Sequence, residues 1–315
     1  MLLFIVGAVS IGCAKKESNF PQKPIHMIVT FPPGGGNDII ARAFAKAMEK
    51  HISQPVVVDN ISGAGGLTGT LETVKAKPDG YTILLQDASL TGMMAYQDNL
   101  PFSLDNLEPL CSVYTNPTWI LTPKDRNYKT LQDFLDAAKK KPGQLSVGVA
   151  VSTGSQYLMA EAIKGYLGLD YKIIPYNGGG PLKVALLGNQ VDIGIIHSPM
   201  MLPEVKEGMI NVLAAGSSMQ GIHYDKLKNI PTLKDLNIPF TFTSTRGFLV
   251  PKGTPPETKK FLEDLIKKAS DGATIKEFAK TFEWDPTWQD HEAYGKFLKD
   301  ELAQYKEIIK KYVKK

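Results

Sequence analysis

Glycine-rich loops are the parts of this sequence that could do chemistry. Four short stretches combine glycine with small or polar residues, at positions 33–38, 63–66, 152–156 and 177–181. Such a loop lets the backbone approach a ligand closely and points the free N–H groups of a following helix at it, so it can hold an anion without a lysine. A single loop of this kind is more often only a tight helix start. Four at one sheet edge favour a binding cleft, because open α/β sheets bind ligands beyond the carboxyl ends of their strands.

Asp38 stands where the first loop meets the expected helix, and it has two interpretations. A carboxylate at a helix start is an ordinary N-cap that contributes about 1 kcal/mol, and this is the interpretation that we favour. The same side chain could also brace the glycine loop. Direct contact with an anionic ligand would be repulsive.

The sequence gives little support for a catalytic or metal site. Residues 63–68 nearly reproduce a dinucleotide-binding G-x-G-x-x-G, but Thr68 stands in place of the last glycine. Neither the phosphate-binding motif G-x-x-x-x-G-K-[ST] nor the serine-nucleophile motif G-x-S-x-G occurs. The five histidines include no i, i+4 pair, so we expect no metal site. We therefore predict a protein that is not an enzyme and uses no cofactor, with an α/β enzyme or nucleotide-binding protein as the alternative.

Short β-rich runs alternate with helical patterns in both halves of the chain, and they lead into glycine- or serine-rich loops or turns. The runs are 25–31, 56–58, 81–85, 145–149, 171–176 and 191–196. This alternation predicts an α/β fold with mostly parallel sheets flanked by helices. The first helical pattern starts at Asp38, and the last one carries an apolar stripe that we assign to packing.

The length of the chain predicts two lobes, since 315 residues are too many for one ordinary domain. The polar segments 124–130 and 243–246 carry no strand signal, and we interpret them as the crossing points between lobes. One lobe then comprises residues 23–122 and 247–315, and the other comprises residues 123–246.

The distribution of charge excludes a nucleic-acid partner. Thirty-six basic against 32 acidic residues leave a net charge of only +4, and five lysines fall within the last ten residues. Before that tail there is no basic stripe interleaved with aromatic residues.

The N-terminal residues predict secretion and a lipid anchor. The uncharged apolar run 2–12 is too short to cross a bilayer, which takes about 20 residues as a helix. Gly12 and Cys13 at its end resemble the cleavage and lipidation site of bacterial lipoproteins. We predict a signal peptide at 1–12, lipid on Cys13 and a tether at 13–22, with a buried N-terminal strand or helix as the alternative. Cys111, the second cysteine, is predicted to be a buried small hydrophobe.

A series of motifs after residue 20 resembles the receptors of tripartite tricarboxylate transporters, also called the Bug family. Its opening part consists of Pro24, Ile25, Phe31, Pro32, Pro33, Gly34, Gly35, Asp38, Ala41 and Arg42. Later parts occur in the same order as in that family, at 56–60, 63–66, 77–82, 142–143, 175–181, 186–192, 231–232 and 251–255.

The resemblance implies a two-lobed periplasmic-binding-protein fold of the second type, a small organic carboxylate as ligand, an extracytoplasmic location and delivery to a membrane permease rather than catalysis. We expect a monomer. The implied ligand-binding residues of the first lobe are Phe31, Gly34, Gly35, Gly36, Asn37, Asp38, Gly65, Gly66, Asp87 and Ala88. Those of the second lobe are Ser152, Thr153, Ser155, Tyr176, His197 and Ser198. Structural roles remain open for four of them, as helix caps (Ser152, Thr153), a packing aromatic (Tyr176) or a satisfied loop histidine (His197).

Two departures from the family bear on the ligand: many relatives have a histidine in place of Tyr157, and amino-acid-binding members commonly have an aspartate in place of Ile196. An α-amino acid needs a carboxylate for its ammonium group, because an unpaired buried cation is costly. Ile196 cannot serve, and Asp192 lies inside a strand where its side chain should point elsewhere. We therefore predict a di- or tricarboxylate, whose distal acid group would pair with His197 if that ring is protonated. Asp87 is the other residue that could supply the negative charge.

Overall fold

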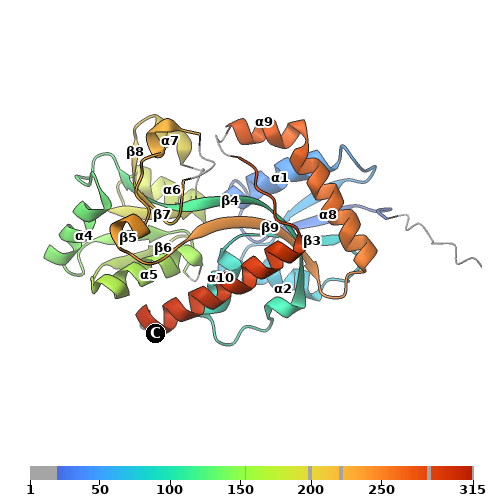
Figure 1. The fold of residues 1–315 in the computed structure, drawn as a ribbon, viewed down its shortest axis with the longest axis horizontal. Coiled ribbons are helices and arrows are strands. Elements are labelled where there is room, and N and C mark those ends of the chain that lie inside the picture. The colour runs from blue at the N-terminus through green and yellow to red at the C-terminus, as the bar shows by residue number, and fades with distance from the viewer. Residues whose placement is uncertain (1–19, 153, 198–200, 220–222, 282–284, 314–315) are drawn as a thin grey trace, which may run out of the picture.

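The structure is a computed structural model that describes residues 20–152, 154–197, 201–219, 223–281 and 285–313. It is elongated, with two α/β halves joined by long strands across the middle (Figure 1). The predicted signal peptide, Cys13 and most of the predicted tether lie outside the described residues, as do Thr153 and Ser198.

The first half is built around three parallel strands, β1 (Ile25–Val29), β2 (Val56–Asn60) and β3 (Thr82–Gln86). Strand β1 lies between β2 and β3, and each strand leads into a helix: α1 (Gly36–Met48), α2 (Leu67–Lys75) after the short 3-10 turn Ala64–Gly66, and α3 (Ser89–Tyr96). The strands form where the β-rich runs of the sequence predict them.

The second half repeats this plan with β5 (Ser146–Val149), β6 (Lys172–Pro175) and β7 (Ile193–His197), of which β5 is central and parallel to both neighbours. Its helices are α4 (Leu131–Lys140), α5 (Ser155–Leu167), α6 (Gly179–Leu187) and α7 (Leu202–Lys206). The expected α/β fold with mostly parallel strands is therefore confirmed.

Two long strands join the halves. Strand β4 (Leu107–Pro123) runs antiparallel to β9 (Thr243–Pro251) as far as Pro117, and from Thr118 onward it pairs with β7 and with β8 (Ile210–Ala215). The strand order is β2-β1-β3-β9-β4-β7-β5-β6, with β8 paired to β4 outside this path. The expectation that residues 243–246 carry no strand was wrong, because they form the first half of β9. The lobe boundaries themselves stay a prediction.

The C-terminal helices cover the first half and reach the second. Helices α8 (Pro256–Asp271) and α9 (Ala273–Thr281) pack near α1, whereas α10 (His291–Tyr312) lies against α3, β4 and α5. Three short 3-10 turns complete the described elements: Leu104–Asn106, Asp225–Leu227 and Lys234–Leu236. Helix α10 therefore contacts both halves, through α3 on one side and α5 on the other.

The apolar stripe of α10 packs into the core, as predicted. Tyr305, Ile308 and Ile309 share a buried cluster with Leu158 and Met159 of α5. Cys111 on β4 is fully buried, as expected.

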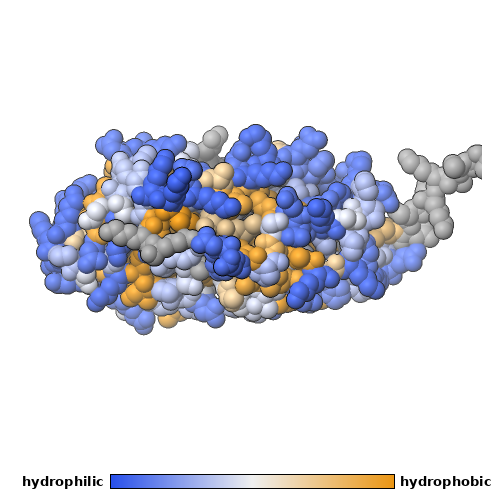
Figure 2. Space-filling model, turned by 90° about the horizontal axis from the view of Figure 1, so that it is seen from below, coloured by the Kyte–Doolittle hydropathy of each residue, from blue (hydrophilic) through white to orange (hydrophobic). Residues whose placement is uncertain are grey.

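On the underside of the molecule, apolar residues gather between hydrophilic ends (Figure 2). Within the part of the chain described, no helix has both the length and the apolar character needed to span a membrane.

Candidate functional site

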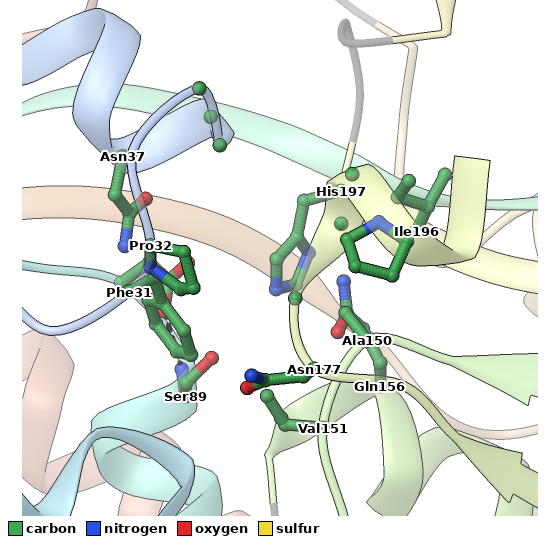
Figure 3. Close-up of a pocket in the computed structure, with 18 of the residues that line it drawn as sticks. Phe31, Pro32, Asn37, Ser89, Ala150, Val151, Gln156, Asn177, Ile196 and His197 are labelled. Atoms are coloured by element: carbon green, nitrogen blue, oxygen red, sulfur yellow. Dashed lines mark hydrogen bonds between the residues drawn. The ribbon is translucent and has the colours of Figure 1, made fainter. Parts of the chain in front are cut away.

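A cavity of about 110 Å³ opens where the loops of the two halves face each other (Figure 3). From the first half it is lined by Phe31, Pro32, Pro33, Gly34, Gly35, Gly36, Asn37, Asp87 and Ser89. From the second half it is lined by Ala150, Val151, Gln156, Asn177, Gly178, Gly179, Gly180, Pro181, Ile196 and His197, and from β9 by Arg246. These loops follow β1, β3, β5, β6 and β7, so the cavity lies at the carboxyl ends of the parallel strands.

Two helices begin at the cavity wall with glycine N-caps. The N-cap of α1 is Gly35 and that of α6 is Gly178, and neither provides a side-chain hydrogen bond to its helix. Gly178 has a φ of 102°, which side-chain-bearing residues rarely adopt. The first N–H groups of both helices therefore remain available, and the partial positive charge of each helix start favours an anion.

Helix α5 starts close by, with Gly154 as its N-cap and Gln156 in its first turn. The amide of Gln156 points toward His197, and the amide of Asn177 points toward Phe31 and Ser89 across the cavity (Figure 3). The second half thus adds neutral polar groups to the wall.

Asp38 braces the first glycine loop rather than capping the helix. Its carboxylate accepts a hydrogen bond from the backbone N–H of Gly34 at 2.9 Å and from Nε of Arg42 at 3.1 Å. Helix α1 begins two residues earlier than expected, at Gly36, so the preferred interpretation of Asp38 as N-cap was wrong. The bond to Gly34 and the ion pair with Arg42 hold the pKa of Asp38 below its usual value against the opposing effect of burial.

Arg246 is the cation of the cavity wall, and sequence reasoning missed it. Its side chain is only 2% exposed. Its Nε donates a hydrogen bond to Oδ1 of Asn37 at 2.7 Å, and its guanidinium lies over the ring of Tyr114 at 5.0 Å from the centroid. Its Nη1 is buried without a hydrogen-bond partner among the described residues, as is Nδ2 of Asn37.

Asp87 is the anion of the wall. Burial alone would raise its pKa, but His197, Arg246 and the hydrogen bonds from Ser89 outweigh burial and leave the pKa lowered. The backbone N–H of Ser89 donates to Oδ1 of Asp87 at 2.9 Å. Asp87 is therefore a carboxylate at neutral pH.

His197 is neutral at neutral pH. Burial, with a smaller contribution from Arg246, lowers the pKa of His197 to about 4, although Asp87 acts in the opposite direction. Its ring lies 3.1 Å from Oγ1 of Thr118 through Nδ1 and 3.4 Å from Oγ of Ser155 through Nε2. With this lowered pKa, His197 lacks at neutral pH the charge that would pair with a ligand acid group.

The structure brings together seven of the residues predicted for the site. The cavity wall includes Phe31, Gly34, Gly35, Gly36, Asn37, Asp87 and His197. Seven further predicted residues do not line it: Asp38, Gly65, Gly66, Ala88, Ser152, Ser155 and Tyr176. Thr153 and Ser198, the other two predicted residues, lie outside the described part of the chain.

The residues that do not line the cavity have structural explanations. The loop with Gly65 and Gly66 packs on the residues directly after β1, where a Cβ on Gly66 would lie 3.3 Å from Oγ1 of Thr30. Tyr176 packs against the buried core, and Ser155 supports the ring of His197. The near-miss dinucleotide motif therefore belongs to a loop that does not line the cavity.

The side chain of Asp192 does not line the cavity, as the sequence predicts, although the residue lies just before β7 rather than inside a strand. Ile196 is buried in the cavity wall. Asp192 points elsewhere, because its carboxylate accepts from the backbone N–H of Ser146 at 2.8 Å and pairs with Arg126 at 2.9 Å. Among the described residues, no group of three or more His, Cys, Asp or Glu side chains is arranged to hold a metal ion.

Residues 40–313 match the family model described as tripartite tricarboxylate transporter family receptor. The chain is 29% identical to BugT of Bordetella pertussis over 317 residues, which cover 98% of this chain and 96% of BugT. It is also 29% identical over 307 residues to the UPF0065 protein in the gbd 5' region of Cupriavidus necator, covering 97% of this chain and 92% of that protein.

Solved structures share the same fold. The periplasmic binding protein BugD matches with a TM-score of 0.84 at 27% identity, over 93% of this chain and 98% of BugD. MatC from Rhodopseudomonas palustris with bound malate matches with a TM-score of 0.83 at 22% identity, over 92% of this chain and 100% of MatC. Rpa4515 of R. palustris with adipate matches with a TM-score of 0.84 at 21% identity, over 93% of this chain and 98% of that protein.

Proposed function

The chain belongs to the receptors of the tripartite tricarboxylate transporter family, and on that basis we propose that it captures a small organic carboxylate between its lobes and delivers it to a membrane permease of that transporter type. The observation that carries the proposal is the cavity at the strand ends. Two helix starts without side-chain caps and one buried arginine favour an anion in it.

A di- or tricarboxylate is the proposed ligand class. Ile196 occupies the wall where an acid would be needed to pair with the ammonium group of an amino acid, and Asp192 is engaged with Ser146 and Arg126. The structures of two proteins with this fold contain malate and adipate, which are both dicarboxylates. Asp87 is the one acid among the described cavity residues that could favour an amino acid instead.

Binding without turnover is the proposed activity. Members of this family are solute-binding receptors. The rival hypothesis, an α/β enzyme that binds a nucleotide at residues 63–68, loses support because those residues do not line the cavity. We propose that ligand binding closes the lobes about β4 and β9, the strands that pass between them.

The proposed location is outside the cytoplasm, in keeping with the family and with the periplasmic binding protein BugD. We further propose that the receptor is a monomer held at the membrane by lipid on Cys13, after removal of residues 1–12.

Calorimetry with succinate, malate, citrate, glutamate and aspartate tests the ligand class. We expect one or more of the plain acids to bind, and NAD and ATP to leave the melting temperature unchanged. Binding of an amino acid with no binding of the plain acids would contradict the ligand class. Stabilisation by a nucleotide alone would contradict the receptor function.

The variant Gly35→Val tests the cavity itself. Gly35 has a φ of −79°, which any residue adopts, and a Cβ there would lie 3.4 Å from the carbonyl oxygen of Pro32, an ordinary contact. The variant should therefore fold but fill space that the anion needs. A ligand at a hundredfold excess over its Kd stabilises the wild-type protein by about 2.7 kcal/mol, and the corresponding rise in Tm should disappear in the variant. A folded variant with an undiminished rise would exclude this loop from the site.

A further inference from the structure

Arg246 carries a buried charge that the described protein neutralises poorly. Its guanidinium hydrogen-bonds the neutral amide of Asn37 and covers the ring of Tyr114, but it forms no ion pair with any described residue. Burying a guanidinium without a counter-ion is costly, because the charge loses hydration that neutral partners only partly replace. Such a group in a cavity wall calls for an anion.

Asp87 does not fill this role. Its charge acts on Arg246 from a distance, since no ion pair joins the two among the described contacts, and its carboxylate is already oriented by Ser89. The charges of Asp87 and Arg246 cancel in the net charge of the cavity wall. The guanidinium nevertheless has no carboxylate in contact with it.

No other described cavity residue can supply positive charge at neutral pH. The lining contains no lysine and no second arginine, and His197 is neutral. Arg246 also sits on β9, one of the two strands that join the lobes, so its position is fixed by the sheet rather than by a mobile loop.

We propose that Arg246 is the counter-ion of the ligand, with its guanidinium pairing with one carboxylate group, and that Asn37 holds the guanidinium in place for this contact. The inference rests on the proposed function and assigns its specificity for anions to one residue. The glycine-capped helix starts would bind the remaining carboxylate of a diacid through backbone N–H groups.

A purely structural role for Arg246 is the competing explanation, since the residue also links β9 to the first turn of α1 and packs on Tyr114. The two explanations differ in what a second negative charge beside Arg246 would do. Asn37→Asp keeps an oxygen acceptor for Nε and adds a carboxylate of nearly the same shape. That carboxylate would neutralise the guanidinium internally and compete with the ligand.

The test is calorimetry with succinate, malate and citrate on the wild type, Arg246→Gln, Asn37→Asp and Arg126→Gln. Arg126→Gln is the matched control, because Arg126 pairs with Asp192 and does not line the cavity. We expect affinity to fall at least about thirtyfold in Arg246→Gln and in Asn37→Asp, as on removal or neutralisation of one partner of a buried charge pair. Affinity in Arg126→Gln should stay within about twofold of the wild type.

Circular dichroism and Tm establish whether each variant is folded. If Arg246→Gln does not fold, the result for Asn37→Asp is sufficient to test the inference. Wild-type affinity in a folded Asn37→Asp would overturn the inference and leave the proposed function standing, whatever Arg246→Gln does. Absence of binding of any of these acids to the wild type would overturn both.

Discussion

Asp87 and Arg246 place opposite charges in the wall of one small cavity, and their balance decides which acids can enter. Because Asp87 is ionised, its carboxylate can accept hydrogen bonds but cannot donate them. It therefore repels a nearby ligand carboxylate and attracts an ammonium or hydroxyl group. The backbone groups of the glycine loops are less selective, because they favour any anion of suitable size.

Replacing Asp87 by asparagine should shift this balance toward plain acids. The amide keeps an oxygen acceptor for the N–H of Ser89 but removes the negative charge, so the affinity for succinate should rise by roughly tenfold, which is about 1.4 kcal/mol. Glutamate and aspartate should gain less or bind more weakly. Calorimetry with the three ligands measures the change. A loss of succinate affinity together with normal folding would show that Asp87 supports the ligand instead of limiting it.

At the scale of elements, periodic patterns predict the parallel strands and their glycine loops well. Runs such as 25–31 and 191–196 are apolar because β1 and β7 are buried, and the glycines after them allow helices to start at the cavity. Asn37, Asp87 and His197 line the cavity at such strand ends. The same rule predicts Gly65 and Gly66 at the site, but they do not line the cavity, since sequence cannot tell a glycine that faces a ligand from one that packs on Thr30, directly after β1.

The first half of β9 shows why hydrophobic patterns in the sequence do not identify Arg246 as a cavity residue. Ser244, Thr245 and Arg246 are polar, yet all three are almost fully buried. Burial of polar groups depends on partners from distant segments, here Asn37 of α1 and Tyr114 of β4, and single-sequence patterns do not reveal such partners. The polarity of 243–246 therefore resembles that of an exposed linker. The β-branched threonines at 243 and 245 are the one local signal of a strand.

Helix α10 introduces an ionisable group between the lobes. Glu301 is buried and accepts hydrogen bonds from Oγ1 of Thr91 on α3 at 2.6 Å and from the hydroxyl of Tyr305 at 3.2 Å. Burial, with a smaller contribution from Asp87, raises the pKa of Glu301 from 4.5 to about 7 despite those two bonds.

Glu301→Gln should remove one pH-dependent contribution to the stability of the protein. A carboxyl group with a raised pKa binds its proton more tightly in the folded state, so its contribution to stability is highest below about pH 4.5 and is lost as the pH rises through about 7. The loss is at most about 3 kcal/mol in the free energy of unfolding. Urea unfolding at several pH values gives the free energy of unfolding of the wild type and of the variant. His197 contributes an opposite trend between pH 6.5 and about 4, but it does so equally in both proteins, so the difference between them isolates Glu301. A difference that does not change with pH would refute the assignment.

At the scale of the whole molecule, both lobes are connected by β4, β9 and α10, and the N-terminal segment leaves from the first lobe. The ring of Phe20 packs on Tyr81 and Phe261, with centroids 4.8 Å and 5.3 Å away. Residues 20–22 of the predicted tether 13–22 therefore lie against the first lobe, and the prediction of a tether is left for residues 13–19. Cys13 and Phe20 are seven residues apart, a length of chain that spans at most about 25 Å when extended. A lipid on Cys13 would thus keep Phe20 within about 25 Å of the membrane surface.

This arrangement makes Cys13→Ser a test of anchoring. Serine cannot carry the thioether-linked lipid, so in the host the variant should leave the membrane fraction or keep its first twelve residues, whereas the wild type should be membrane-bound and lack them. Fractionation followed by intact mass measurement distinguishes these outcomes. Cys111→Ser is the matched control, because the thiol of Cys111 is fully buried on β4 and should have no part in attachment. If Cys13→Ser fractionates like the wild type and the two proteins differ in mass only by the substituted atom, the N-terminal run is not a lipoprotein signal.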